Sequence, residues 1–230
     1  MKQSAYIGNR YIVYDDCFLG EQECYSLLDS HEQLLNSQQR GTAIFIDHAD
    51  YHFVAKHYQR GGLIRYFNKD WYFACHATHS RAFKEWNLLY QLRDIGLPVP
   101  KPIASNVELR ACFYQADLMT ERIDAVPLSQ YLMKDVMEQL SWRQLGQTIK
   151  QFHQHAVYHE DLNASNILID SNMQFFLIDF DKARIKSGAT WKVDNLFRLR
   201  RSLTKYTNKN PGFSFTNENW QQLVASYRDA

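Results

Sequence analysis

The amino-acid sequence predicts an α+β fold with two lobes: a β-rich first lobe with one long helix, and a small, mostly helical second lobe. Short runs of aromatic and β-branched residues recur in the first half, as is typical of strands. Hydrophobic residues at helical spacing dominate the second half. Between the halves lies a polar stretch, residues 120–126, which Pro127 ends and which we expect to be a hinge. We therefore assign residues 1–121 to the first lobe and residues 122–230 to the second.

Strands account for most of the first lobe. Residues 43–47 and 52–58 are short aromatic and β-branched runs, and residues 49–50 between them favour the turn of a β-hairpin. Val107 and residues 111–119 have the same composition and predict further strands. The lobe is thus expected to be built on a sheet.

One helix interrupts these strands. Over residues 80–95 the hydrophobic side chains recur at helical spacing, at Phe83, Trp86, Leu89 and Tyr90. Gly96 and Pro98 then predict where the helix ends, because both residue types disfavour its continuation.

Helices and one β-hairpin make up the predicted second lobe. A first helix opens near Ser141 and has hydrophobic residues on one face. Residues 166–170 and 174–179 are two buried-type strands joined by a tight turn. Residues 191–206 and 217–228 have the pattern of helices. The expected order is therefore helix, hairpin, helix, helix.

Charge and composition exclude several classes of protein. The 26 Lys and Arg residues nearly balance the 25 Asp and Glu residues, so the net charge of +1 does not support a globally basic nucleic-acid-binding protein. No run approaches the roughly 18 consecutive apolar residues of a membrane-spanning helix, and the first residues lack the apolar stretch of a secretory signal. The four cysteines are scattered without a C-x-x-C pair, so we expect reduced thiols and a cytoplasmic protein.

The most informative stretch runs from His159 to Asp170 and is followed by a strand that leads to Asp179. Asn166 follows Asp161 by five positions, and Asp179 follows Asp161 by 18. An isolated Asp-rich loop beside a hairpin is more often a turn and a helix cap, but here the whole pattern occurs in order. It resembles the catalytic loop and metal-binding strand of the protein-kinase-like superfamily, H-x-D-x-x-x-x-N followed by D-F-x.

The chemistry of phosphoryl transfer accounts for these residue types. The reaction needs a hydroxyl held in line with the γ-phosphate, and cations that offset charge on the phosphate oxygens. Asp161 can orient the acceptor hydroxyl and accept its proton. Asn166 and Asp179 offer the hard oxygen ligands that suit Mg²⁺. The resemblance therefore implies that ATP and Mg²⁺ are the cofactors.

The resemblance also implies a lysine that anchors ATP and a glutamate that holds the lysine. Lys56, late in the second strand of the predicted hairpin, is similar to the lysine. Glu85, on the helix over residues 80–95, is similar to its ion-pair partner.

The sequence departs from a protein kinase in four ways. It has no G-x-G-x-x-G, which leaves Gly41 and Thr42 as the candidate phosphate-covering turn. Glu160 stands where many protein kinases have Arg, and Asp181 replaces the glycine of D-F-G. Asp181 is either a third metal-site carboxylate or a turn residue. Too few residues follow Asp179 for the usual activation segment, and A-P-E is absent, so protein substrates are not expected.

Four segments together resemble the 3-deoxy-D-manno-octulosonic acid (Kdo) kinases of the lipopolysaccharide kinase family. They are residues 54–62, 159–168, 178–182 and 195–203, and the resemblance spans about residues 40–203. It implies ATP-dependent phosphorylation of the 4-hydroxyl of a Kdo sugar on a lipid A precursor. The protein would then act as a peripheral protein on the cytoplasmic face of the inner membrane.

A strongly basic stretch between Lys182 and Lys205 supports an anionic partner, because it contains eight Lys and Arg residues and a single acid, Asp194. A second stretch, residues 56–73, mixes basic and aromatic side chains. A sugar carboxylate, phosphorylated lipid A and an anionic inner leaflet all favour such surfaces, whereas nucleic acid is not expected. The residues that we expect to bind the acceptor are Arg60, Lys182, Arg198 and Arg201.

Two other functions stay open at this point. One is a heptose kinase or an antibiotic-type phosphotransferase on the same scaffold. The other is a non-catalytic pseudokinase that serves as a binding module, although the presence of Lys56, Asp161, Asn166 and Asp179 argues against it.

Overall fold

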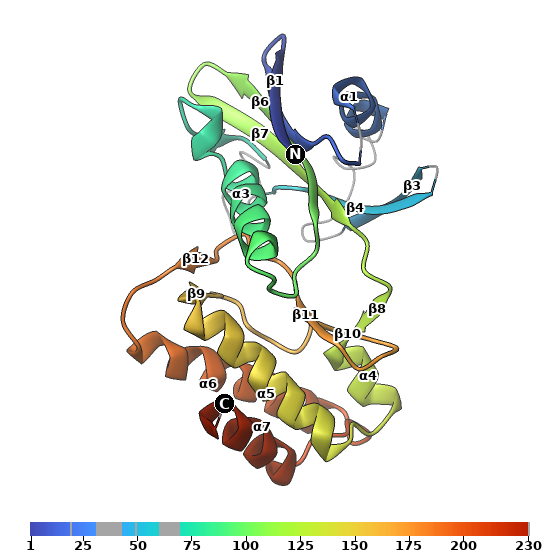
Figure 1. Ribbon diagram of the computed structural model, residues 1–230, viewed down its shortest axis with the longest axis vertical. Coiled ribbons are helices and arrows are strands. Elements are labelled where there is room, and N and C mark those ends of the chain that lie inside the picture. Colours follow the sequence, from blue (N-terminus) through green and yellow to red (C-terminus); the bar gives the residue numbers. More distant parts are fainter. Residues whose placement is uncertain (19, 31–42, 49, 60–69, 230) are drawn as a thin grey trace. The chain divides into compact units, whose positions relative to one another are not determined.

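The computed structural model describes residues 1–18, 20–30, 43–48, 50–59 and 70–229 (Figure 1). Its mixture of helices and mainly antiparallel sheets confirms the predicted α+β class. Contacts divide the chain into two compact units. The first consists of Met1–Gln91 and Pro100–Arg122, and the second of Leu92–Val99 and Ile123–Ala230. The roles that the sequence suggests for two lobes, nucleotide anchoring and acceptor binding, stay predictions.

The first unit is built on an antiparallel sheet with strand order β1-β2-β6-β7-β4-β3, in which β5 also pairs with β7. The strands are β1 (Lys2–Ile7), β2 (Arg10–Asp15), β3 (Ala43–His48), β4 (Tyr51–His57), β5 (Tyr72–Phe73), β6 (Pro102–Arg110) and β7 (Phe113–Glu121). The helices are α1 (Glu21–Ser30), a short 3₁₀ helix (Ala77–His79) and α3 (Arg81–Asp94), which continues into the second unit.

Strand β4 presents different chemistry on its two faces, because side chains alternate along a strand. Phe53 and Ala55 are buried in a core to which Cys24 of α1 also belongs. Lys56 lies on the opposite face, where it contacts Glu85 of α3. The alternation of side chains along β4 therefore points the Lys56 ammonium toward α3.

The elements predicted for the first half are confirmed as the β3–β4 hairpin, α3, β6 and β7. Helix α1 and strands β1 and β2 have no counterpart in the sequence prediction. Among the α1 side chains that the structure describes, Cys24 and Leu27 belong to the core, and two positions are too short a stripe to stand out in the sequence pattern. Its start is stabilised when Glu23 Oε2 accepts a hydrogen bond from Gly20 N, 2.9 Å away.

The second unit combines helices with two small sheets, β11-β10-β8 and β12-β9. The helices are α4 (Leu128–Lys134), α5 (Gln139–Gln154), α6 (Thr190–Lys209) and α7 (Asn217–Asp229). The strands are β8 (Ala125–Pro127), β9 (Val157–Tyr158), β10 (Ile167–Asp170), β11 (Phe175–Leu177) and β12 (Arg184–Ile185). The predicted helices and the β10–β11 hairpin are confirmed, whereas α4, β9 and β12 were not anticipated.

The segment over residues 120–126 is less irregular than the predicted hinge. Its first residues belong to β7, and its last belong to β8, which pairs with β10 in the register Leu168↔Pro127. Only Arg122–Asp124 lie outside strands. The pairing of β8 could not be anticipated, because Pro127 suggested a break rather than a strand end.

Helices α5 and α7 pack side by side at one glycine (Figure 1). A Cβ atom on Gly146 of α5 would lie 2.2 Å from Leu223 O of α7, so any other residue would force the helices apart. Ser226 Oγ also donates a hydrogen bond to Arg143 O at 2.7 Å. Trp142 of α5 is completely buried and packs against Phe215, with 5.6 Å between ring centroids.

Among the helices that the structure describes, none combines the length and apolar character that a membrane crossing requires.

Candidate active site

In the first unit, Lys56 is held by Glu85. Lys56 Nζ donates a hydrogen bond to Glu85 Oε1 at 2.8 Å, and Tyr58 OH donates to Glu85 Oε2. The glutamate is only 3% exposed, so its charge needs these partners. The structure therefore confirms the predicted contact between Lys56 and Glu85. That Lys56 anchors the phosphates of ATP stays a prediction.

His57, the neighbour of Lys56, forms a buried ion-pair network that sequence reasoning missed. Its Nδ1 lies 2.6 Å from Asp117 Oδ1 and its Nε2 lies 3.3 Å from Asp70 Oδ2. Asn106 Nδ2 donates to the other oxygen of Asp117 at 3.2 Å. Burial lowers the pKa of His57, but the two carboxylates outweigh it and raise the pKa to about 9. At neutral pH the imidazole is therefore protonated and ties β4 to β7.

Three of the candidate residues, Gly41, Thr42 and Arg60, lie outside the described residues.

In the second unit, the predicted catalytic loop is anchored to α6 through His159 and Asn195. Asn195 Oδ1 accepts a hydrogen bond from His159 N at 3.3 Å, and Asn195 Nδ2 donates to His159 O at 3.1 Å. His159 Nε2 lies 2.9 Å from Ile178 O, and because a carbonyl only accepts, Nε2 must carry the proton. Burial lowers the pKa of His159, so the ring is neutral. It packs edge-on against Phe180, with 4.9 Å between ring centroids.

The loop between Asp161 and Asn166 is shaped by side-chain hydrogen bonds to its own backbone. Asn166 Nδ2 donates to Asp161 O at 2.9 Å. Asn163 Oδ1 accepts from Ser165 N at 2.8 Å and from Asn166 N at 3.2 Å. These bonds leave the Asp161 carboxylate on the exposed side of the loop. The Asn166 amide is oriented by its nitrogen, and its oxygen is the atom that could accept a bond from a ligand.

Asp179 follows β11 in a strained backbone conformation. Its φ is 65°, a left-handed value that is uncommon for residues other than glycine. Ile178 N donates to Asn166 O at 3.0 Å, which keeps Asp179 next to the catalytic loop. Phe180 is buried, whereas Asp181 is partly exposed. Backbone strain of this kind clusters at functional sites, so the geometry fits a ligand-binding role for Asp179.

A cavity of about 590 Å³ lies between this loop and α6, and it is strongly basic. The loop contributes Asp161, Asn163 and Ser165. The residues from α6 are Arg198, Arg201, Ser202, Lys205, Tyr206 and Lys209. The structure thus brings the predicted Arg198 and Arg201 to the same cavity as Asp161.

Lys182 does not line this cavity and is exposed. Lys205, Tyr206 and Lys209 do line it, and sequence reasoning missed their part in the site. The signal that would have found them is helical spacing, because residues 198, 201, 205 and 209 fall on one face of a helix.

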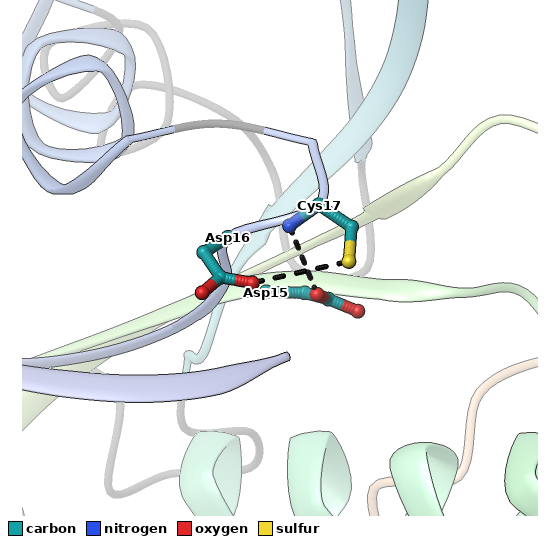
Figure 2. Close-up of side chains that lie close together, drawn as sticks. All are labelled: Asp15, Asp16 and Cys17. Carbon is teal, nitrogen blue, oxygen red and sulfur yellow. Dashed lines mark hydrogen bonds between the residues drawn. The ribbon is translucent and has the colours of Figure 1, made fainter.

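The only described group of three acidic, cysteine or histidine ligand atoms close enough to share a metal lies elsewhere, at Asp15, Asp16 and Cys17 (Figure 2). Its acidic side chains already have partners. The Met1 ammonium donates to Asp15 Oδ1 at 2.8 Å and also to Asp16, and Cys17 N donates to Asp15 Oδ1 at 3.2 Å. This cluster at the end of β2 is therefore explained by local hydrogen bonds.

Comparisons with known proteins identify what the chain is similar to. Residues 27–227 match the model of the family described as "Lipopolysaccharide kinase (Kdo/WaaP) family". A 3-deoxy-D-manno-octulosonic acid kinase of Pasteurella multocida (strain Pm70) is 40% identical, over 90% of this chain and 91% of the relative. Kinases of the same name are 41% identical in Haemophilus influenzae (strain PittEE), over 85% of each chain, and 34% identical in Vibrio vulnificus (strain YJ016), over 99% and 98%.

The His57 network predicts a pH dependence of stability. The folded-state pKa of about 9 lies above the ordinary value of about 6.5. The network therefore stabilises the fold fully below pH 6.5, and this contribution is lost as the pH rises through 9. In denaturant unfolding, His57→Gln should lose on the order of 2–3 kcal/mol relative to the parent at pH 6 and far less at pH 10.

His52→Gln is the matched control, because His52 also pairs with an aspartate, Asp47, but is exposed. It should change the free energy of unfolding little at any pH. A loss for His57→Gln that is equal at pH 6 and pH 10 would contradict the prediction.

Proposed function

Because the chain belongs to the lipopolysaccharide kinase (Kdo/WaaP) family, we propose that it transfers the γ-phosphate of ATP to the 4-hydroxyl of a Kdo sugar on a lipid A precursor. The observation that carries this proposal is the basic cavity of the second unit, which is lined by Asp161 and by four cationic side chains of α6. A Kdo sugar offers both a hydroxyl for the carboxylate and a carboxylate for the cations.

Asp161 is the proposed general base. Its carboxylate is exposed at the cavity, so it can accept a hydrogen bond from the acceptor hydroxyl. The hydroxyl would thereby be oriented for attack on the γ-phosphorus and would give up its proton to Asp161 as the new P–O bond forms, while the bond from the γ-phosphorus to the bridging oxygen breaks and ADP leaves. The buried, neutral His159 holds the loop in place through its hydrogen bond to Ile178 O and takes no part in the proton transfer.

Asn166 and Asp179 are the proposed Mg²⁺ ligands, with Asp181 as a third candidate. These ligand atoms fit the ion, because an amide oxygen and a carboxylate are the hard ligands that Mg²⁺ prefers. The Asn166 nitrogen donates its hydrogen bond to Asp161 O, so the amide oxygen is the atom that would bind the metal. A bound Mg²⁺ would offset charge on the ATP phosphates. In the first unit, Lys56 is the proposed phosphate anchor, and Glu85 keeps its ammonium in place.

The anionic groups of the acceptor are proposed to bind along α6. Arg198 and Arg201 carry planar guanidinium groups that suit a sugar carboxylate. In the part of the chain that the structure describes, neither of them forms an ion pair with a protein carboxylate. Their charge therefore stays available for a ligand.

Contact with the cytoplasmic face of the inner membrane is the last part of the proposal. The basic stretch between Lys182 and Lys205 would face anionic lipid. Val193 and Phe197, one turn apart on α6, are 68% and 64% exposed and add an apolar contact. In vesicle flotation the protein should float with anionic vesicles and not with neutral ones, and equal flotation with both would refute this contact.

Substitution of Asp161 tests the proposed function. Asp161→Asn should lower kcat by about 10²–10⁴-fold, because the amide can no longer accept the proton. Phosphate incorporation from radiolabelled ATP into the Kdo-lipid A precursor measures the effect. Glu160→Gln is the control: it removes a carboxylate one residue away, whose exposed ion pair with Arg184 contributes little. Similar activity in the two variants, each with an unchanged circular dichroism spectrum, would contradict the assignment.

Substitution of Asp179 tests the metal site. Asp179→Asn should raise the Mg²⁺ concentration needed for half-maximal activity by at least about tenfold, because it removes the charged ligand. Asp194→Asn, on an exposed position of α6 outside the cavity, should leave the Mg²⁺ dependence unchanged. A chelator should abolish activity in all forms. An unaltered Mg²⁺ titration for Asp179→Asn would rule out this ligand.

A further inference from the structure

The cationic row on α6 is longer than one sugar ring. Residues 198, 201, 205 and 209 are three or four positions apart, so their side chains share one face of the helix. At a rise of about 1.5 Å per residue, the row extends roughly 16 Å along the helix axis. All four side chains line the same cavity, so an acceptor that uses the full row must extend beyond one monosaccharide.

Three contacts between the catalytic loop and α6 define where Asp161 lies along this row. His159 is bonded to Asn195, Ala164 N donates to Ser202 Oγ at 3.2 Å, and Ser165 Oγ lies 2.9 Å from Tyr206 OH. Asp161 comes between the first two contacts in the chain. It therefore lies beside the part of α6 that carries Arg198 and Arg201.

Lys205 and Lys209 lie one and two turns further along α6. Tyr206, which also lines the cavity, is held in place by stacking on Phe213 with 5.3 Å between ring centroids. A carboxylate on the reacting sugar is close to its own hydroxyl. It can reach Arg198 or Arg201, but it cannot at the same time occupy the far end of the row.

We propose that Lys205 and Lys209 bind a second anionic group of the acceptor, a phosphate on the sugar unit next to the one that is phosphorylated. This inference rests on the proposed function. A lysine ammonium binds phosphate as a compact point charge, and a guanidinium fork can hold a carboxylate through two parallel hydrogen bonds. The two ends of the row thus bind two anionic groups at different positions along α6, and the cavity favours an acceptor that carries both.

The test compares two Kdo-containing acceptors, the phosphorylated lipid A precursor and the same molecule after removal of its phosphates. The variant Lys205→Gln/Lys209→Gln should raise KM for the phosphorylated acceptor about tenfold and change kcat by less than twofold. For the dephosphorylated acceptor its KM should equal that of the parent. The control Lys134→Gln/Arg143→Gln removes two exposed charges of the same unit outside the cavity and should change neither KM.

Equal increases in KM for both acceptors, or no increase for either, would overturn the inference while leaving the proposed function intact. Arg201→Gln serves as a further comparison, because it should raise KM for both acceptors. If the parent protein phosphorylates neither acceptor, the proposed function fails, and the inference fails with it.

Discussion

The second unit depends on the two hydrogen bonds between Asn195 and the backbone of His159. A single side-chain amide satisfies both the N–H and the C=O of the loop residue, and Asn195 is only 1% exposed. Either backbone group, if left unsatisfied at this depth, would cost about 1–3 kcal/mol. The bonds also define the register between the loop and α6. Every further contact of the site, from Ala164 with Ser202 to Ser165 with Tyr206, follows this register.

The two units differ in whether their cationic side chains form ion pairs with protein carboxylates. In the first, Lys56 and the protonated His57 are neutralised by buried carboxylates, which orients them and binds β4 to its neighbours. In the second, no ion pair is formed by the four cavity cations with any described carboxylate, although Asp161 shares their cavity. Buried ion pairs suit cations such as Lys56 that must keep one position. Cations without a carboxylate partner suit a surface that binds an anionic ligand.

The β10–β11 hairpin and the loop before it could be predicted from the sequence because their features are local, while the catalytic role of the loop stays a prediction. The spacing of Asp161, Asn166 and Asp179 and the two apolar strands are sufficient to indicate them. The pairing of Lys56 with Glu85 was also accessible, once the strand and the helix were placed. These features need only neighbouring residues or a known order of elements.

Other features depend on contacts between distant segments and have no local signal. The protonated state of His57 requires carboxylates from β7 and from residue 70, and neither can be paired with it by spacing alone. The role of Asn195 is visible only once α6 lies against the loop. Helical periodicity could have placed Lys205 and Lys209 on one face of α6. The cavity that they line forms only when α6 packs against the loop, so the sequence alone could not show it.

Whether this protein phosphorylates a Kdo sugar can be decided by locating the transferred phosphate. The full-length protein would be incubated with ATP, Mg²⁺ and either the Kdo-lipid A precursor or a heptose-containing acceptor. The products would then be analysed by mass spectrometry and phosphorus NMR. We expect a single new phosphate on the Kdo 4-hydroxyl and none on heptose. Transfer to heptose alone, or ATP binding without transfer to either sugar, would contradict it.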